Sequence, residues 1–154
     1  MISMIAYRKV IDAVTTHSLR LPDAPQGQQS GQELATLADG RTIVVLFDGV
    51  TRPTDQPKAI AASVKVLTPA ELDAIKDEVK ANSPMVQLIY KRTEDKIRER
   101  YSASDEAKFA RLGVGALLGA YTFGPGEQDE LVAFGHFVEQ CRQWGRDERA
   151  KVGL

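Results

Sequence analysis

The sequence is poor in residues that build covalent links or metal sites. Among 154 residues there is one cysteine, Cys141, and there are two histidines. A single thiol forms no internal disulfide and no cysteine-based zinc site, and it suits a reducing compartment better than a disulfide-rich secreted module. His17 and His136 lie far apart, and neither sits in a recognised ligand spacing. We therefore expect no metal and no cofactor.

Long apolar runs and a strong net charge are also missing. The longest apolar run, residues 112–123, is about half of the roughly 20 residues that a membrane span needs. The N-terminus does not show the order of basic, apolar and small residues typical of a signal peptide. A formal net charge of −1 supplies no global field for nucleic acid or anionic lipid. These features favour a soluble cytosolic protein without a membrane partner.

The first segment, residues 1–32, is predicted to hold a short helix and a flexible linker. Tyr7, Val10, Ile11 and Val14 recur at helical spacing, which indicates an amphipathic helix over residues 5–16. The stretch LPDAPQGQQSGQ that follows is rich in proline, glycine and glutamine and has little to bury. Such a composition is typical of a linker or an exposed loop.

Residues 33–67 are predicted to form a small antiparallel β module. Asp39-Gly40 and Asp48-Gly49 supply the positive φ that tight turns require. Strands are expected near residues 33–37 and 41–47, with a third near 60–66, where β-branched and aromatic residues gather. A hairpin or three-stranded sheet of this size needs a helix or a partner to cover its apolar face.

From residue 68 to residue 154 the pattern is helical. Thr68-Pro69-Ala70-Glu71 is a capping box with proline at the first helical position. Further helix starts are predicted at Ser83-Pro84, at Ser102 and near Glu127. The predicted fold is therefore α+β, a small antiparallel sheet followed by a mainly helical C-terminal region.

No residue pattern specifies a reaction. Asp39 and Asp48 both precede glycine, and turn chemistry accounts for both. Cys141 is expected to be a buried apolar side chain. His136 lies five residues before it, on a different face of the same predicted helix. We predict no catalytic residues. An enzyme whose site forms only in the fold, for example from Asp48 and His17, stays open as an alternative.

The helical region instead favours contacts between helices. Gly115-x-x-x-Gly119 would let another backbone approach closely, within the chain or between chains. Basic residues near position 95 alternate with acidic ones, as in Glu94 and Arg98, which favours ion pairs over a nucleic-acid footprint. Trp144 lies beside Arg146, and both residue types are enriched in interface hot spots. We predict an interface made of Met85, Leu88, Ile89, Phe134, Phe137, Val138 and Trp144.

Two stretches, SPMVQLIYKRTEDKIRERYSASDEAKFARLG and FGHFVEQCRQWGRDERAKVGL, carry a resemblance to known proteins. The first resembles a helix ending in I-R-x-R-Y-S with an acidic helix start behind it. The second resembles a C-terminus of the type F/Y-x-x-[FY]-V-E-x-C-R-x-W-G-R. Both patterns occur in small proteins encoded near the tail and tail-fibre genes of tailed bacteriophages and prophages. Together the stretches cover under half of the chain.

The resemblance implies a role in the virion or in its assembly, and it supplies no catalytic residues. We therefore expect a non-enzymatic tail-associated protein, either a structural component or an assembly chaperone of the tail fibre or baseplate. Its partners would be further copies of itself, another tail protein, or both, and it would be made in the host cytoplasm. Incorporation into the virion is left open. The alternative is a phage or bacterial regulatory module that binds and blocks a host protein complex.

Overall fold

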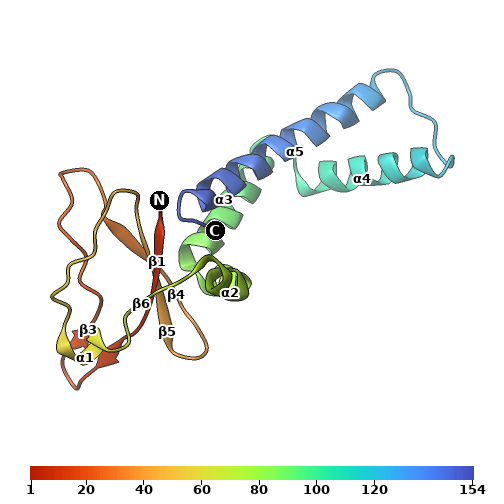
Figure 1. The fold of residues 1–154 in the computed structure, drawn as a ribbon. Coiled ribbons are helices and arrows are strands. Elements are labelled where there is room, and N and C mark those ends of the chain that lie inside the picture. Colours follow the sequence, from red (N-terminus) through yellow and green to blue (C-terminus); the bar gives the residue numbers. More distant parts are fainter. The chain divides into compact units, whose positions relative to one another are not determined.

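A four-stranded antiparallel sheet and a series of helices build the chain in the computed structural model, which describes residues 1–154 (Figure 1). The predicted α+β class is confirmed. The strands are β1 (Ser3–Arg8), β2 (Val10–Ile11), β3 (Thr16–His17), β4 (Gly31–Thr36), β5 (Arg41–Leu46) and β6 (Lys65–Val66). The helices are α1 (Lys58–Ala61), α2 (Pro69–Asn82), α3 (Pro84–Arg98), α4 (Ala103–Leu117) and α5 (Glu127–Ala150).

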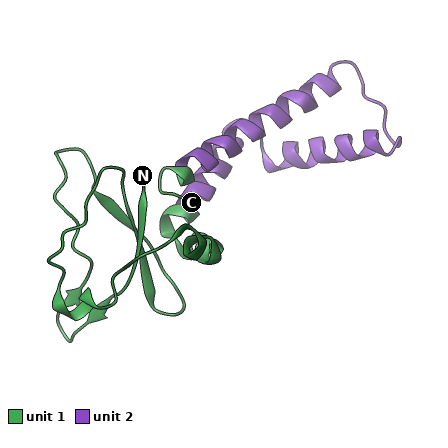
Figure 2. Cartoon of the chain, in the orientation of Figure 1, with its two compact units in different colours: residues 1–87, 149–154 green, residues 88–148 purple.

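The chain divides into two compact units, shown in different colours in Figure 2. Unit 1 comprises residues 1–87 and 149–154, and unit 2 comprises residues 88–148. Unit 1 therefore holds the sheet together with α1 and α2. Unit 2 holds α4 and most of α3 and α5.

The predicted hairpin forms the centre of unit 1. Strands β4 and β5 pair antiparallel and are joined through Asp39 and Gly40, where Gly40 has φ +85°. The amide of Gly40 donates to the carbonyl of Leu37 at 3.0 Å, which closes the turn. Asp48-Gly49 forms a second turn, with Gly49 at φ +77°. Both Asp-Gly pairs therefore act in turns, as their chemistry predicted.

The predicted N-terminal helix is wrong, because residues 3–8 form β1 in the middle of the sheet. The strand order is β4-β5-β1-β6, so β1 has a neighbour on each side. Val10–Ile11 and Thr16–His17 form a separate two-stranded ribbon in place of the end of that helix. The predicted N-terminal segment thus contributes a central strand to the sheet that was expected from residues 33–67 alone.

Both faces of this sheet are buried, and the side chains alternate between two core clusters. Met4 and Ala6 of β1 belong to one cluster, which Val79 of α2 and Val152 cover. Ile5 and Tyr7 belong to the other, which includes Ile60 of α1, and the residues of β5 alternate in the same way. A central strand buried on both sides reads as a continuous apolar run without the alternation typical of a surface strand.

The third predicted strand is confirmed only at its end. Residues 65–66 form β6, whereas residues 58–61, which the strand was expected to enter at Ile60, form the helical turn α1. Ile60 is fully buried from that turn. Residues 21–30 of the predicted linker contain no regular element, as expected of a loop, but its last two residues, Gly31 and Gln32, begin β4.

The predicted helix starts of the C-terminal region are confirmed. Thr68 caps α2 and Ser102 caps α4, each in a reciprocal capping box with the residue three positions on. The helices α3 and α5 begin at Pro84 and Glu127. At the other end of α5, residues 149–154 belong to unit 1, where Val152 is buried in the sheet core.

Candidate protein–protein interface

An aromatic cluster joins the helices of unit 2. Phe109 of α4 stacks on Phe134 of α5 with ring centroids 4.8 Å apart. Tyr101 packs edge-on against Phe134 at 5.1 Å and against Phe137 at 5.6 Å. Ile97, Val138 and Cys141 form the buried cluster beside these rings. The predicted burial of Cys141 is confirmed. The inner face of α4 therefore contacts α5 through Phe109, the one buried side chain of this helix.

The outer face of α4 is also apolar, but nothing in the chain covers it. Leu117 is 89% exposed, Leu118 is 78% exposed and Val114 is 56% exposed. Ala107 and Ala110 continue the same face toward the start of the helix and are exposed as well. A helix with apolar residues on both faces is normally buried on both. This face, made of Ala107, Ala110, Val114, Leu117 and Leu118, is called the outer stripe below.

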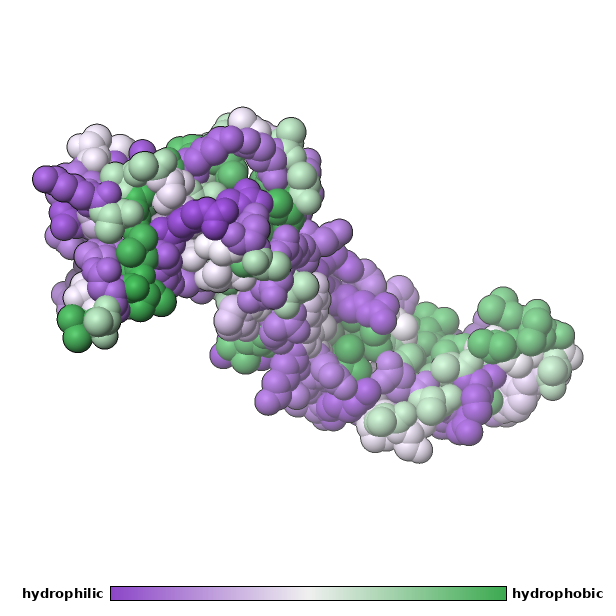
Figure 3. All heavy atoms as spheres, turned by 90° about the horizontal axis from the view of Figure 1, so that it is seen from below, coloured by the Kyte–Doolittle hydropathy of each residue, from purple (hydrophilic) through white to green (hydrophobic).

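A groove of about 440 Å³ lies next to the outer stripe, between the end of α4 and the start of α5. Most of its lining is apolar, and it consists of Gly113, Ala116, Leu117, Phe123, Gln128, Leu131 and Val132. In the space-filling view, apolar side chains gather at the end of unit 2 that carries the connection between α4 and α5 (Figure 3). The stripe and the groove together form one continuous apolar surface, because Leu117 belongs to both.

The connection between α4 and α5 is held in place by hydrogen bonds around Glu127. Its carboxylate accepts from the Tyr121 hydroxyl at 2.5 Å and from the amide of Gly124 at 3.2 Å. The bond to Glu127 is the main cause of a raised pKa for Tyr121. The groove therefore lies in an anchored part of unit 2.

Gly115 and Gly119 do not serve a contact between helices in the way that their spacing suggested. Gly119 has φ +70° and follows the end of α4, where glycine is favoured because it has no Cβ. A Cβ at Gly115 would approach the Cβ of Tyr121 to 3.0 Å. Tyr121 folds back over Gly115 and donates its amide to the Gly115 carbonyl at 3.1 Å. The close approach therefore lies within the chain and stabilises the end of the helix.

The seven predicted interface residues have different places in the structure. Ile89 and Val138 are buried in the single chain, and Phe134 and Phe137 pack in the aromatic cluster. Met85 packs against the sheet core of unit 1. Leu88 is exposed. Their role in binding a partner stays a prediction.

Trp144, the seventh residue, has a partner within unit 2. The ammonium group of Lys96 lies 4.7 Å from the centroid of the indole ring, a cation–π contact between α3 and α5. Charged residues bridge other parts of this unit, since Arg98 pairs with Glu94 at 3.8 Å and with Glu106 at 2.7 Å. The expected pairing of Glu94 with Arg98 is therefore present.

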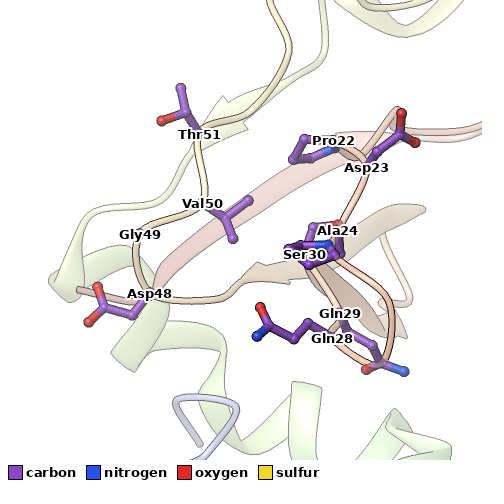
Figure 4. A pocket seen from close by; sticks show the side chains of 11 residues that line it. Pro22, Asp23, Ala24, Gln28, Gln29, Ser30, Asp48, Gly49, Val50 and Thr51 are labelled. Carbon is purple, nitrogen blue, oxygen red and sulfur yellow. The ribbon is translucent and has the colours of Figure 1, made fainter.

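A second hollow lies among the loops of unit 1. It has a volume of about 350 Å³ and is lined by residues of segments 22–30 and 48–51. Figure 4 shows the carboxylates of Asp23 and Asp48 pointing away from each other and out of the hollow. No group of three or more His, Cys, Asp or Glu side chains is placed to hold a metal ion.

The pair Asp48 and His17, considered above for a fold-assembled site, is not brought together. Asp48 follows β5 at the end where Leu46 pairs with Ser3, whereas His17 pairs with Val10, beyond the other end of β1. The six residues of β1 separate these ends by roughly 16–20 Å. The ring of His17 instead contacts the carboxylate of Asp12 at 2.7 Å.

No protein-family model, no curated protein and no solved structure matches the chain. None of its helices has both the length and the apolar character required to cross a bilayer.

The outer stripe is the surface that sequence reasoning missed. Residues 107, 110, 114 and 117 are small or apolar and follow a 3-4-3 spacing that indicates such a stripe. This spacing was not recognised because residues of the inner face of α4 lie between them in the sequence.

Proposed function

We propose that the chain is a non-enzymatic, tail-associated protein of a bacteriophage, a structural component or an assembly chaperone of the tail fibre or baseplate. It acts by binding protein through the outer stripe and groove of unit 2. The observation that carries this proposal is the exposure of Val114, Leu117 and Leu118 on a helix that contacts α5 through Phe109 on its opposite side. A contiguous apolar patch of this kind on the surface of a protein marks a site of interaction with a partner.

The phage part of the proposal rests on the resemblance of residues 83–113 and 134–154 to proteins encoded near tail genes. These two stretches fold mainly into α3, the greater part of α4 and about the last two thirds of α5. They supply the aromatic cluster of unit 2, including Tyr101, Phe109 and Phe134. The resemblance therefore concerns mainly residues of unit 2, which supports carrying it over to that unit's role.

Two carboxylates with lowered pKa values serve in helix caps, which supports a structural role for them. The pKa of Glu71 is lowered to about 2 by its bonds to Lys65 and to Thr68, within the cap of α2. The pKa of Asp105 is lowered by Ser102 in the cap of α4. Perturbed groups that converge in a cleft would point to catalysis, but these lie at helix ends.

The experiment is a complementation test in the phage or prophage that carries the gene. Deletion of the gene should give particles with missing or defective fibres or baseplates, visible by negative-stain electron microscopy, and the wild-type chain should restore them. Val114→Asp should fail to restore them, because it places a charge in the outer stripe. Normal particles after deletion would refute the proposal.

The chain provides a matched control for that variant. Val14 is 95% exposed in the turn between β2 and β3 of unit 1. Val14→Asp is the same substitution away from unit 2 and should restore assembly fully. Equal failure of both variants would show that the defect is general and would remove the outer stripe from the mechanism.

A further inference from the structure

The outer stripe has the residue spacing of a helix-pairing seam. Ala107, Ala110, Val114 and Leu117 are separated by three, four and three residues, and all four are exposed. This 3-4 spacing places apolar side chains along one line of a helix and is the pattern that packs against a second helix. The occupant that the stripe fits is therefore a helix.

The sizes of the side chains along the stripe indicate which helix. Its first half carries only alanine, at positions 107 and 110, and its second half carries Val114, Leu117 and Leu118. Two such stripes in parallel would set alanine against alanine and leucine against leucine, which gives an uneven gap. In antiparallel orientation Val114 and Leu117 each face an alanine, the arrangement that fills the space between helices best.

We propose that the occupant is α4 of a second copy of this chain, paired antiparallel about a two-fold axis. The axis passes level with residue 112, so that Ala107 faces Leu117 of the second copy and Ala110 faces its Val114. Each contact is repeated by the symmetry, as an isologous interface requires. This proposal deepens the proposed function, on which it rests, by naming the partner of the outer stripe.

The extent of the stripe sets the strength of the pairing. The helix α4 has 15 residues and is about 22 Å long. One strip of contact between two such helices falls short of the roughly 800 Å² that each partner buries in a standard interface. We therefore expect a reversible dimer whose population changes with concentration in the micromolar range.

Repulsion between like charges opposes the pairing slightly and makes the stability of the dimer depend on salt concentration. The stripe itself carries no charged side chain, and Arg111 borders it on the exposed surface of α4. In the proposed register the two Arg111 side chains lie on the same flank, close to the axis. Salt screens like charges, so raising the salt concentration should strengthen the dimer, whereas a dimer held by ion pairs would weaken.

Analytical ultracentrifugation of the full chain over a concentration series tests the pairing. Wild type should shift from monomer to dimer, Leu117→Ala should weaken the dimer at least roughly tenfold, and Val114→Asp should abolish it. Val14→Asp should behave as wild type. A wild-type chain that stays monomeric to several hundred micromolar, or dimers that Val114→Asp leaves intact, would overturn the proposal.

The register is tested with single cysteines in a Cys141→Ala background. Residue 111 lies one position from the axis, so Arg111→Cys should cross-link between copies. Residue 104 lies eight positions from it, so the two copies of Ser104→Cys should be about 24 Å apart along the axis and should not cross-link. Equal cross-linking at both positions would show a parallel pair and refute the proposed register.

These outcomes separate the two proposals. A chain that stays monomeric, but whose Val114→Asp variant fails in the assembly test, would refute self-pairing and keep a tail-associated role with another partner on the stripe. A dimer that Val114→Asp abolishes, together with normal particles after gene deletion, would keep the self-pairing and refute the proposed function.

Discussion

The two faces of α4 should respond very differently to truncation, although both carry large apolar residues. Phe109 is 6% exposed and stacks on Phe134. Phe109→Ala removes buried area and leaves a cavity, which costs about 3–5 kcal/mol in the free energy of unfolding. Leu117 is 89% exposed. Leu117→Ala removes almost no buried area, and both residues favour helices, so its cost should stay within about 0.5 kcal/mol.

The measurement is urea denaturation followed by circular dichroism, with the protein diluted until ultracentrifugation shows only monomer. Dilution matters because any self-association would add stability that depends on concentration. A loss of more than about 1 kcal/mol in Leu117→Ala under these conditions would mean that the side chain has a partner within the chain. That result would refute the reasoning that the outer stripe is free to bind.

Three further predictions concern a capping-box carboxylate, a helix N-cap and a close-packed glycine. Acid should destabilise unit 1 partly through Glu71, whose pKa of about 2 lies below its ordinary value of 4.5. Its contribution is present above about pH 4.5 and is lost as the pH falls through about 2, so Glu71→Gln should flatten the acid limb of a stability–pH curve. Ser102→Ala should cost about 1 kcal/mol in urea melts, because it removes the N-cap of α4. Gly31→Ala should lower the thermal midpoint measured by calorimetry, because a Cβ there would overlap the carbonyl oxygen of Val45.

Local chemistry was the part of the fold that could be predicted from the sequence. The turn at Asp39-Gly40 depends on the positive φ of Gly40, and the starts of α2 and α4 depend on Thr68 and Ser102. Each of these signals lies within four residues and needs no tertiary context. For the same reason they located the hairpin and the helix starts but not their partners.

The N-terminal strand could not be predicted because its pattern depends on where it lies in the sheet. Ile5 and Tyr7 face one core cluster and Met4 and Ala6 face the other, so all four positions are apolar and no alternation appears. Val14 then completed an apparent helical spacing, although it is exposed in the turn between β2 and β3. A central position in a sheet is a property of distant pairing, which periodicity within one segment does not contain.

The candidate site was missed for a related reason. Sequence reasoning chose large apolar residues such as Phe134, Val138 and Trp144, because the same types of side chain are common in protein cores and in interfaces. The structure places Val138 in the core and puts Lys96 over Trp144. Which apolar residues are left over after the core has formed depends on the packing of α4 against α5, and the alanines of the outer stripe carry no strong signal of their own.

The division of the chain has a consequence for the order of events on the ribosome. Unit 1 is interrupted by unit 2, and the buried Val152 that completes its sheet core comes after the interruption. At ordinary elongation rates the roughly 60 inserted residues take about 3 to 12 s to synthesise. During that interval the helical insert can fold while the core around Met4 and Val79 still lacks its last side chain, so the final closure of unit 1 is set by translation.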